Sequence, residues 1–228
     1  MRCKIADLIV EVPEAGGMAP RCRSYSTSAD APAQITIDET RYKADRYDGL
    51  SFEDVCYMES GLQFYGHLLR YDGMLLHASA ISYEGKAYLF SGPCGVGKST
   101  HTRQWQSLFG DRVQVFNDDK PALRCLEGQW YAYGTPWCGK DGINQNQKVP
   151  LGGICFLQQA TENHIRRLSN IEAVQKVFSQ TTHILYKKEN MERLLSHIGR
   201  LVECVPVWEL RNLPGADAAI LSRDTLCR

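Results

Sequence analysis

The sequence predicts an α/β protein, with a domain over residues 72–228 and a small N-terminal β/α lobe over residues 1–71. Three observations support this prediction. Strand-like and helix-like segments are mixed throughout the larger part. A glycine-rich segment at residues 92–99 follows a strand-like run and precedes a helix-like run. In the smaller part, residues 13–33 are rich in Pro, Gly, Ser and Ala, which is typical of a loop.

Within the N-terminal lobe, short strand-like runs at residues 5–12 and 34–37 flank this loop. A helix is predicted over residues 51–70. Ser51 supplies a capping hydroxyl, acidic residues follow in the first turn, and apolar residues then recur at helical spacing. We expect this accessory lobe to pack on the larger domain.

The larger domain begins with two apolar runs, residues 74–81 and 87–90, which a turn signal joins into a predicted hairpin. A helix over residues 98–109 and a strand over residues 113–116 follow. The remaining predictions are a hairpin at 123–133 with Gly128 at its tip, strands at 149–157 and 205–210, and helices at 170–183, 188–203 and 215–227.

Composition narrows the class of protein. The 228 residues include 43% hydrophobic and 23% charged residues, which is typical of a globular protein. The 26 basic and 26 acidic residues balance, so nucleic-acid binding is not expected. No apolar run reaches the roughly 18 residues of a membrane helix. Nine scattered cysteines without a C-x-x-C pair fit a reduced, cytoplasmic protein.

Residues 92–99 match the phosphate-loop pattern G-x-x-x-x-G-K-[ST] at every fixed position. Glycines allow successive backbone N–H groups to converge on phosphate oxygens, and the following helix adds its N-terminal partial charge. Lys98 would reach the β- and γ-phosphates, and the Ser99 hydroxyl would bind Mg²⁺. The predicted ATP-binding residues are Gly92, Pro93, Cys94, Gly95, Val96, Gly97, Lys98, Ser99 and Thr100.

An acidic pair, Asp118 and Asp119, comes at the end of the strand predicted at residues 113–116. Only 20 residues separate Lys98 from Asp118, which is room for one helix and one turn. The acids are therefore expected on the first strand after the loop helix, where a nucleotide-binding sheet holds its metal carboxylate. One aspartate can bind Mg²⁺ while the other acts as general base toward an acceptor. The sequence leaves open which does which.

His77 lies in the first strand of the predicted 74–81/87–91 hairpin. If the turn is centred on Glu84 and Gly85, His77 is paired with Gly92, at the mouth of the loop. An imidazole there could contact the γ-phosphate or orient an acidic partner. A slip of one residue in the register would turn the side chain away.

The order of these motifs, His77-Ala-Ser-Ala-Ile, then residues 92–100, then Phe116-Asn-Asp-Asp, resembles the catalytic domain of HPr kinase/phosphorylase. That family shares its fold with phosphoenolpyruvate carboxykinase, so the resemblance implies a P-loop kinase domain with a mixed sheet. It covers residues 72–160. The C-terminal segment Val205-Pro-Val-Trp-Glu-Leu before a helix resembles small HPr-kinase-related proteins of peptide-modifying gene clusters, including lasso peptide clusters.

The resemblance implies an ATP- and Mg²⁺-dependent kinase that acts on a serine hydroxyl of a peptide or protein. It implies that one aspartate of the pair Asp118/Asp119 is the base and that Ser99 binds the metal with an aspartate of the pair. Together with the reading of the loop and the hairpin, the predicted catalytic residues are His77, Lys98, Asp118 and Asp119. Thr100 stands where the bifunctional enzyme has Glu, and its downstream Arg-Gly motif has no match here. HPr as substrate and the phosphorylase reaction are therefore not expected.

Several alternatives stay open. The chain could be a kinase of free serine or a sugar, or an ATP-binding switch protein without an acceptor. The polar segment 139–148 reads equally as an acceptor loop, with Lys140 offering a charge, or as a hairpin loop. Trp137 suits an acceptor pocket or, more commonly, a core. Cys94 is either an inert small residue or a redox-sensitive thiol. A homo-oligomer is compatible with the sequence.

Overall fold

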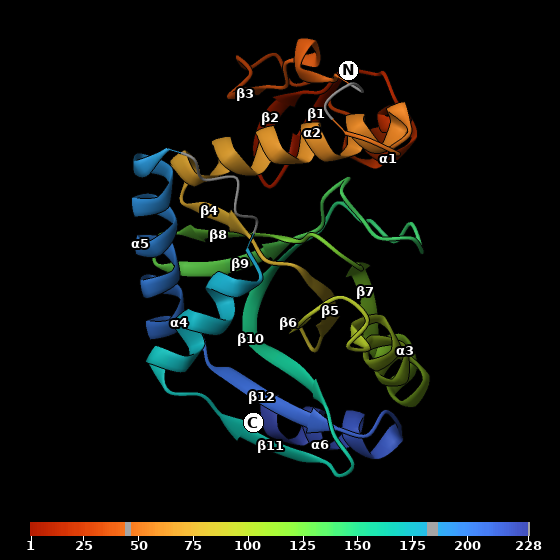
Figure 1. Cartoon of the computed structure of the whole chain (residues 1–228), viewed down its shortest axis with the longest axis vertical. Helices are drawn as coiled ribbons and strands as arrows, with labels where there is room; N and C mark the ends of the chain where they lie inside the picture. Colours follow the sequence, from red (N-terminus) through yellow and green to blue (C-terminus); the bar gives the residue numbers. More distant parts are fainter. Residues whose placement is uncertain (44–46, 182–186, 228) are drawn as a thin grey trace.

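The computed structural model describes residues 1–43, 47–181 and 187–227. Figure 1 shows a large curled sheet with helices on its sides, and a smaller lobe at the N-terminal end. Helix α2 (Phe52–Leu68) lies between the lobe and the sheet. This arrangement confirms the mixed α/β fold with a small N-terminal lobe.

In its described residues, the N-terminal lobe contains a three-stranded sheet and two α-helices. Strand β1 (Arg2–Ile5) pairs antiparallel with β2 (Leu8–Glu11), which pairs parallel with β3 (Ile35–Thr36). The prediction of one strand over residues 5–12 is therefore wrong. Ala6 and Asp7 both have positive φ, at 51° and 61°, and form the tight turn of a hairpin.

Tertiary contacts explain this turn. The Asp7 carboxylate accepts a hydrogen bond from Tyr133 Oη at 2.9 Å and pairs with Lys148 Nζ at 2.9 Å. These residues are far away in the sequence, and the turn lacks the usual Asn-Gly or Asp-Gly pair. The local sequence therefore gives no sign of the reversal.

The segment 13–33, predicted as a loop, contains the short helix α1 (Met18–Cys22) and a following 3₁₀ turn. In contrast, the predicted helix at 51–70 is confirmed as α2. Ser51 and Asp54 form a reciprocal capping box at its start.

Over the described ranges, the main sheet has nine strands in the order β4-β8-β9-β10-β6-β5-β7, with β12 added beside β10 and β11 beside β12. The longest strand, β10, runs parallel to β6 and β12 and antiparallel to β9, so the sheet is mixed. The strands are β4 (Gly73–Leu75), β5 (Ala78–Tyr83), β6 (Lys86–Ser91), β7 (Val113–Asn117), β8 (Ala122–Leu126), β9 (Gln129–Tyr133), β10 (Lys148–Gln159), β11 (His164–Arg167) and β12 (Val207–Asn212).

The sheet curls along β10, which changes its neighbour at a register irregularity between Leu151 and Gly153. Its first residues pair with β9, and its residues from Ile154 onward pair with β12. A Cβ at Gly153 would lie 2.7 Å from the Trp208 ring, so glycine is needed at this close approach.

The predicted strand at 74–81 is split into β4 and β5 by Leu76 and His77. Strand β4 pairs with β8, whereas β5 pairs with β6 and β7. At the break, the His77 N–H donates to Gln180 O at 2.8 Å instead of to a strand. The chain thus changes partners at the residue singled out as a site candidate.

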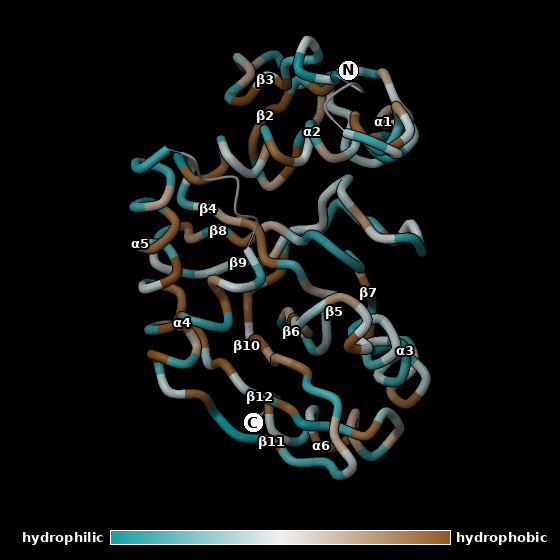
Figure 2. Tube along the Cα trace, in the orientation of Figure 1, coloured by the Kyte–Doolittle hydropathy of each residue, from teal (hydrophilic) through white to brown (hydrophobic). Residues whose placement is uncertain are grey.

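Helices α4 (Asn170–Ser179) and α5 (Lys188–Cys204) share one apolar cluster with the sheet, and α3 (Lys98–Phe109) and α6 (Ala216–Leu226) share another. Figure 2 shows apolar and polar residues alternating along α5, as expected for a helix with one buried face. The helix predicted at 170–183 ends at Ser179, and its positions 182 and 183 lie outside the described residues. Within the described ranges, no helix is long and apolar enough to cross a membrane.

The lobe and the sheet share an apolar cluster. Phe64 of α2 stacks on Trp137, which follows β9, with ring centroids 4.7 Å apart. Tyr65 packs edge-on against Trp137, and Leu75 and Tyr133 of the sheet belong to the same cluster. Trp137 is fully buried, which confirms the core alternative for this residue. A domain boundary at residue 71 remains a prediction.

We expect Phe64→Ala to lower the free energy of unfolding by about 3–5 kcal/mol, because it leaves a cavity against Trp137. Urea unfolding followed by tryptophan fluorescence and by circular dichroism should show one shared transition. Phe52→Ala is the matched control, since Phe52 is on the same helix but 50% exposed. Equal losses in the two variants would contradict a shared core.

Candidate active site

The loop of residues 92–99 begins where β6 ends and finishes as α3 starts at Lys98. Gly92, Gly95 and Gly97 have positive φ values of 143°, 78° and 105°. Residues that carry a side chain rarely adopt such backbone angles. Glycine therefore allows the loop to turn back over the start of α3. Ser99 is half-buried in the first helical turn, and Thr100 and Cys94 are exposed.

Lys98 is directed back into this loop. Its ammonium donates to Gly92 O at 2.9 Å and to Pro93 O at 3.2 Å. Burial lowers the pKa of Lys98, and the negative charge of Asp119 partly opposes this shift. The charge of Lys98 is therefore held at the loop and in the field of Asp119.

The hairpin register is the predicted one, with Ala78 paired to Ser91. The ladder ends at this pair, so His77 and Gly92 follow directly beyond it without pairing in the sheet. The His77 carbonyl accepts from Ser91 Oγ at 2.7 Å. Its imidazole Nε2 lies 2.9 Å from Asp119 Oδ1. Two roles were considered for His77, contact with the γ-phosphate and orientation of an acidic partner. The contact with Asp119 corresponds to the second role.

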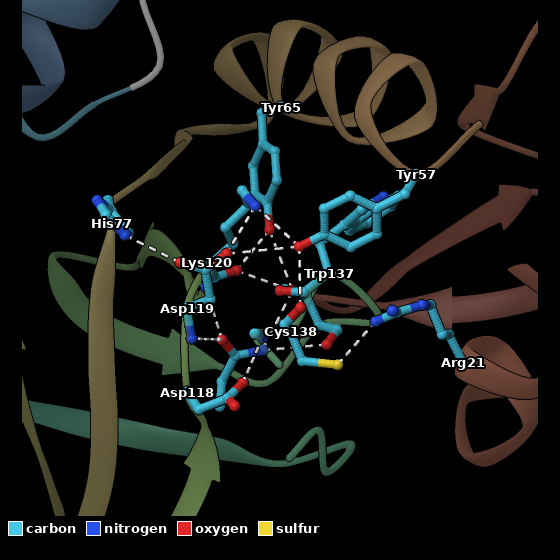
Figure 3. Close-up of polar contacts among 12 residues, drawn as sticks. Arg21, Tyr57, Tyr65, His77, Asp118, Asp119, Lys120, Trp137 and Cys138 are labelled. Atoms are coloured by element: carbon cyan, nitrogen blue, oxygen red, sulfur yellow. Dashed lines mark hydrogen bonds and ion pairs between the residues drawn. The ribbon is translucent and has the colours of Figure 1, made fainter. Parts of the chain in front are cut away.

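Asp119 has cationic and polar neighbours on both carboxylate oxygens (Figure 3). His77 contacts Oδ1, Lys120 Nζ contacts Oδ2 at 2.6 Å, and the Tyr57 hydroxyl lies 3.5 Å from Oδ2. Burial alone would raise the pKa of Asp119, but the His77 hydrogen bond and the Lys120 charge lower it to about 2. This carboxylate is therefore ionised at neutral pH.

Asp118 lies in a different environment. Its Oδ1 accepts a hydrogen bond from the Gly139 backbone N–H at 2.6 Å. Burial raises the pKa of Asp118, the Gly139 bond partly offsets this, and the charges of Asp119 and Asp141 add to the increase. The negative charge of Asp118 is thus poorly compensated by its neighbours.

The side chain of Asn117 stabilises a turn that directs the side chains of Asp118 and Asp119 to different neighbours. Its side-chain oxygen accepts from the backbone N–H groups of Asp119 at 3.1 Å and Lys120 at 2.8 Å. Such a turn ends β7 and releases the next residues from strand geometry. As a result, the aspartates face two different sets of groups.

Three contact residues of this site were missed in the sequence. Tyr57 of α2 accepts from Lys120 Nζ at 2.8 Å and donates to Cys138 O at 3.0 Å. Arg21 of α1 donates to Cys138 Sγ at 3.1 Å. Lys120 could have been noticed as the residue after the acidic pair. Tyr57 and Arg21 carry no local signal, because the fold alone brings their helices to the site.

A pocket of about 300 Å³ opens beside Asp119, between the N-terminal lobe and the sheet domain. Lys140, from the polar segment, lines it together with residues of both parts. The lining residues are Gly16, Gly17, Arg21, Glu53, Asp54, Tyr57, Asp119, Lys120, Cys138, Gly139 and Lys140.

Asp118 and Ser99 offer the type of oxygen ligand that Mg²⁺ prefers. Within the described part of the chain, no three His, Cys, Asp or Glu side chains are grouped to hold a metal ion by themselves. Mg²⁺ is usually held by one or two carboxylates together with substrate phosphates and water. The poorly compensated charge of Asp118 fits this type of site, and Ser99 in the loop helix supplies a hydroxyl oxygen.

The chain belongs to the family described as SynChlorMet cassette protein ScmC, whose model matches residues 51–213. This match includes α2, the loop and both aspartates, and it confirms the recognition of a small gene-cluster protein. No curated protein matches the chain.

Among solved structures, the chain is similar to the HPr(Ser) kinase/phosphatase from Coxiella burnetii. The two share 12% identity over 66% of this chain and 87% of that one, with a TM-score of 0.39. The superposition is loose, so the residue roles depend on the geometry of this chain.

The two aspartates should have opposite effects on stability. The folded pKa of Asp119 lies below its ordinary value of 3.8, so Asp119 stabilises the fold above about pH 4. This contribution is lost as the pH falls toward 2. Asp119→Asn should therefore lower the unfolding free energy at pH 7 by about 1–2 kcal/mol, with the difference shrinking in acid.

For Asp118 the sign is reversed. Its folded pKa is raised, so its ionised form costs stability at neutral pH and protonation recovers it. Asp118→Asn should raise the unfolding free energy at pH 7, measured by urea titration. If both variants shift stability in the same direction, the two environments are not as described.

Proposed function

We propose that this protein is an ATP- and Mg²⁺-dependent kinase that transfers the γ-phosphoryl group to a hydroxyl, the serine side chain of a peptide or protein. The main support is the position of Asp119. It lies in the field of Lys98, is hydrogen-bonded by His77, and lines the pocket between the lobes. A carboxylate between a phosphate loop and an open pocket suits transfer to an acceptor.

Two carboxylates with different environments support a kinase rather than a switch protein. A nucleotide switch needs one metal carboxylate, whereas a hydroxyl kinase also needs a base. We assign Asp119 as the base, because it lines the pocket. A general base must first lie within hydrogen-bonding distance of the acceptor hydroxyl, and its pKa is the second criterion. We assign the metal role to Asp118 and Ser99, since a bound cation would compensate the buried charge of Asp118.

In the proposed reaction, the acceptor hydroxyl oxygen forms a bond to the γ-phosphorus while the bond from that phosphorus to the β–γ bridging oxygen breaks. The hydroxyl proton passes to Asp119, and ADP leaves. His77 and Lys120 hold the Asp119 carboxylate in place. Lys98 and the loop amides offset the negative charge on the transferred group. Asp118 and Ser99 would hold Mg²⁺, which would supply further charge neutralisation.

The family description as a cassette protein is in keeping with an acceptor encoded beside this chain. Co-encoded peptides are therefore the first candidates, and the cytoplasm is the proposed site of action. Mass spectrometry of peptides co-expressed with the protein would detect the addition of a phosphoryl group to serine.

Asp119→Asn should lower the rate of phosphoryl transfer by about 10²–10⁴-fold, because the base is lost. ATP binding should change little, since Lys98 and the loop remain. Asp118→Asn should instead raise the Mg²⁺ concentration needed for half-maximal rate. Transfer is measured with labelled ATP and an acceptor peptide, and nucleotide binding by calorimetry.

Asp111→Asn serves as the control, because this exposed aspartate lies in the 3₁₀ turn after α3, away from the site. It should have no effect. ATP hydrolysis that needs no acceptor and is unchanged by either site variant would contradict the kinase proposal and favour a switch protein.

His77→Ala should lower kcat by about 10-fold or more with a smaller change in KM for ATP, because His77 positions Asp119. His77→Gln keeps a donor of similar reach and should recover part of the rate. If both variants change only KM for ATP, His77 serves nucleotide binding instead of positioning the base.

A further inference from the structure

The N-terminal lobe contributes a cation to the pocket beside Asp119. Arg21 extends from α1 toward Cys138, as Figure 3 shows. Its guanidinium donates to Cys138 Sγ at 3.1 Å and lies over the Tyr57 ring, 4.8 Å from the centroid. Both contacts fix the direction of the side chain toward the pocket that it lines.

The charge of Arg21 is not matched by these contacts. Burial raises the pKa of the Cys138 thiol, so its sulfur is a neutral acceptor at pH 7. Among the described residues, no carboxylate lies within ion-pair distance of Arg21. A guanidinium has five donors in a planar fork, and among the described residues Arg21 donates a side-chain hydrogen bond only to Cys138.

The other charges of the pocket leave this position available. Lys120 is paired with Asp119, and Asp54 caps α2 by accepting from Ser51. Glu53 lies in the first turn of α2, where the helix dipole stabilises a negative charge. Lys140 lines the same pocket and makes no ion pair in the described part of the chain. Arg21 and Lys140 are therefore the two cations of this pocket that form no ion pair among the described residues.

We infer that Arg21, supported by Lys140, binds a carboxylate of the acceptor next to the hydroxyl that is phosphorylated. This inference rests on the proposed kinase function and names the class of acceptor: a peptide with an acidic side chain beside its serine. A planar carboxylate matches the guanidinium fork, and a charge-assisted bond in a half-buried pocket is strong. The N-terminal lobe then contributes to substrate specificity, and α1 is the part of the lobe that binds the acceptor.

Capped peptides test this inference, because acetylated and amidated ends leave the side chain as their sole carboxylate. The set contains a serine beside Asp, beside Asn and beside Lys, with free serine as a separate arm. Binding to the full chain is measured by fluorescence anisotropy with a non-hydrolysable ATP analogue, and transfer is measured with ATP.

The wild type should bind and phosphorylate the Asp peptide about tenfold better than the Asn peptide. Arg21→Ala should remove this preference by raising KM, with kcat and ATP affinity nearly unchanged. Arg21→Glu should reverse it toward the Lys peptide, which loss of folding could not produce. Arg23→Ala is the matched control, since Arg23 is exposed and does not line the pocket.

Equal affinity of the wild type for the Asp and Asn peptides, or equal loss for all peptides in Arg21→Ala, would overturn the inference. A preference for free serine over the Asp peptide would overturn the acidic peptide as acceptor. The preference for the Asp peptide is measured by binding, without catalysis. Its loss is therefore distinct from a failure of the kinase proposal, which would appear as no phosphoryl transfer to any acceptor.

Discussion

The packing of α2 on the sheet domain is the interaction on which the arrangement of the site depends. Phe64 stacks on Trp137, and Tyr65 reaches Thr135 Oγ1 at 3.0 Å, so one face of α2 is buried on the segment after β9. That segment continues directly into Cys138 and Gly139. Tyr57, two turns earlier on the same helix, is thereby brought to Asp119 and Lys120. The lobe and the candidate site are thus positioned by the same contact.

A second constraint separates two neighbouring side chains of the same type. The turn at Asn117 sends Asp119 toward His77 and Lys120, and Asp118 toward the Gly139 N–H. One carboxylate is held ionised by its partners, and the other is buried with less compensation. Adjacent residues of identical chemistry can then serve different steps, because the environment sets their pKa values apart.

Local signals were sufficient where the responsible contacts are close in sequence. The helix from Lys98 to Phe109, the hairpin with Gly128 at its tip and the pairing of Ala78 with Ser91 are formed by neighbouring residues, and the sequence predicted each of them. The turn at Ala6 and Asp7 was missed, because the contacts of Asp7 to Tyr133 and Lys148 span most of the chain. The strand break at His77 was missed for a related reason, since Gln180 accepts its N–H.

The sequence by itself determined the phosphate-loop pattern, the acidic pair one helix later and the pairing of Ala78 with Ser91 next to His77, because fixed spacing along adjacent elements dictates these relations. Only the tertiary structure decided that His77 contacts Asp119 and not Asp118, and that Arg21 and Tyr57 of the N-terminal lobe line a pocket there. These contacts depend on how α1 and α2 pack against the sheet. The packing of elements that are distant in sequence is set by the shape of the shared core. Many separate segments of the chain build that core, so no short segment of the sequence predicts it.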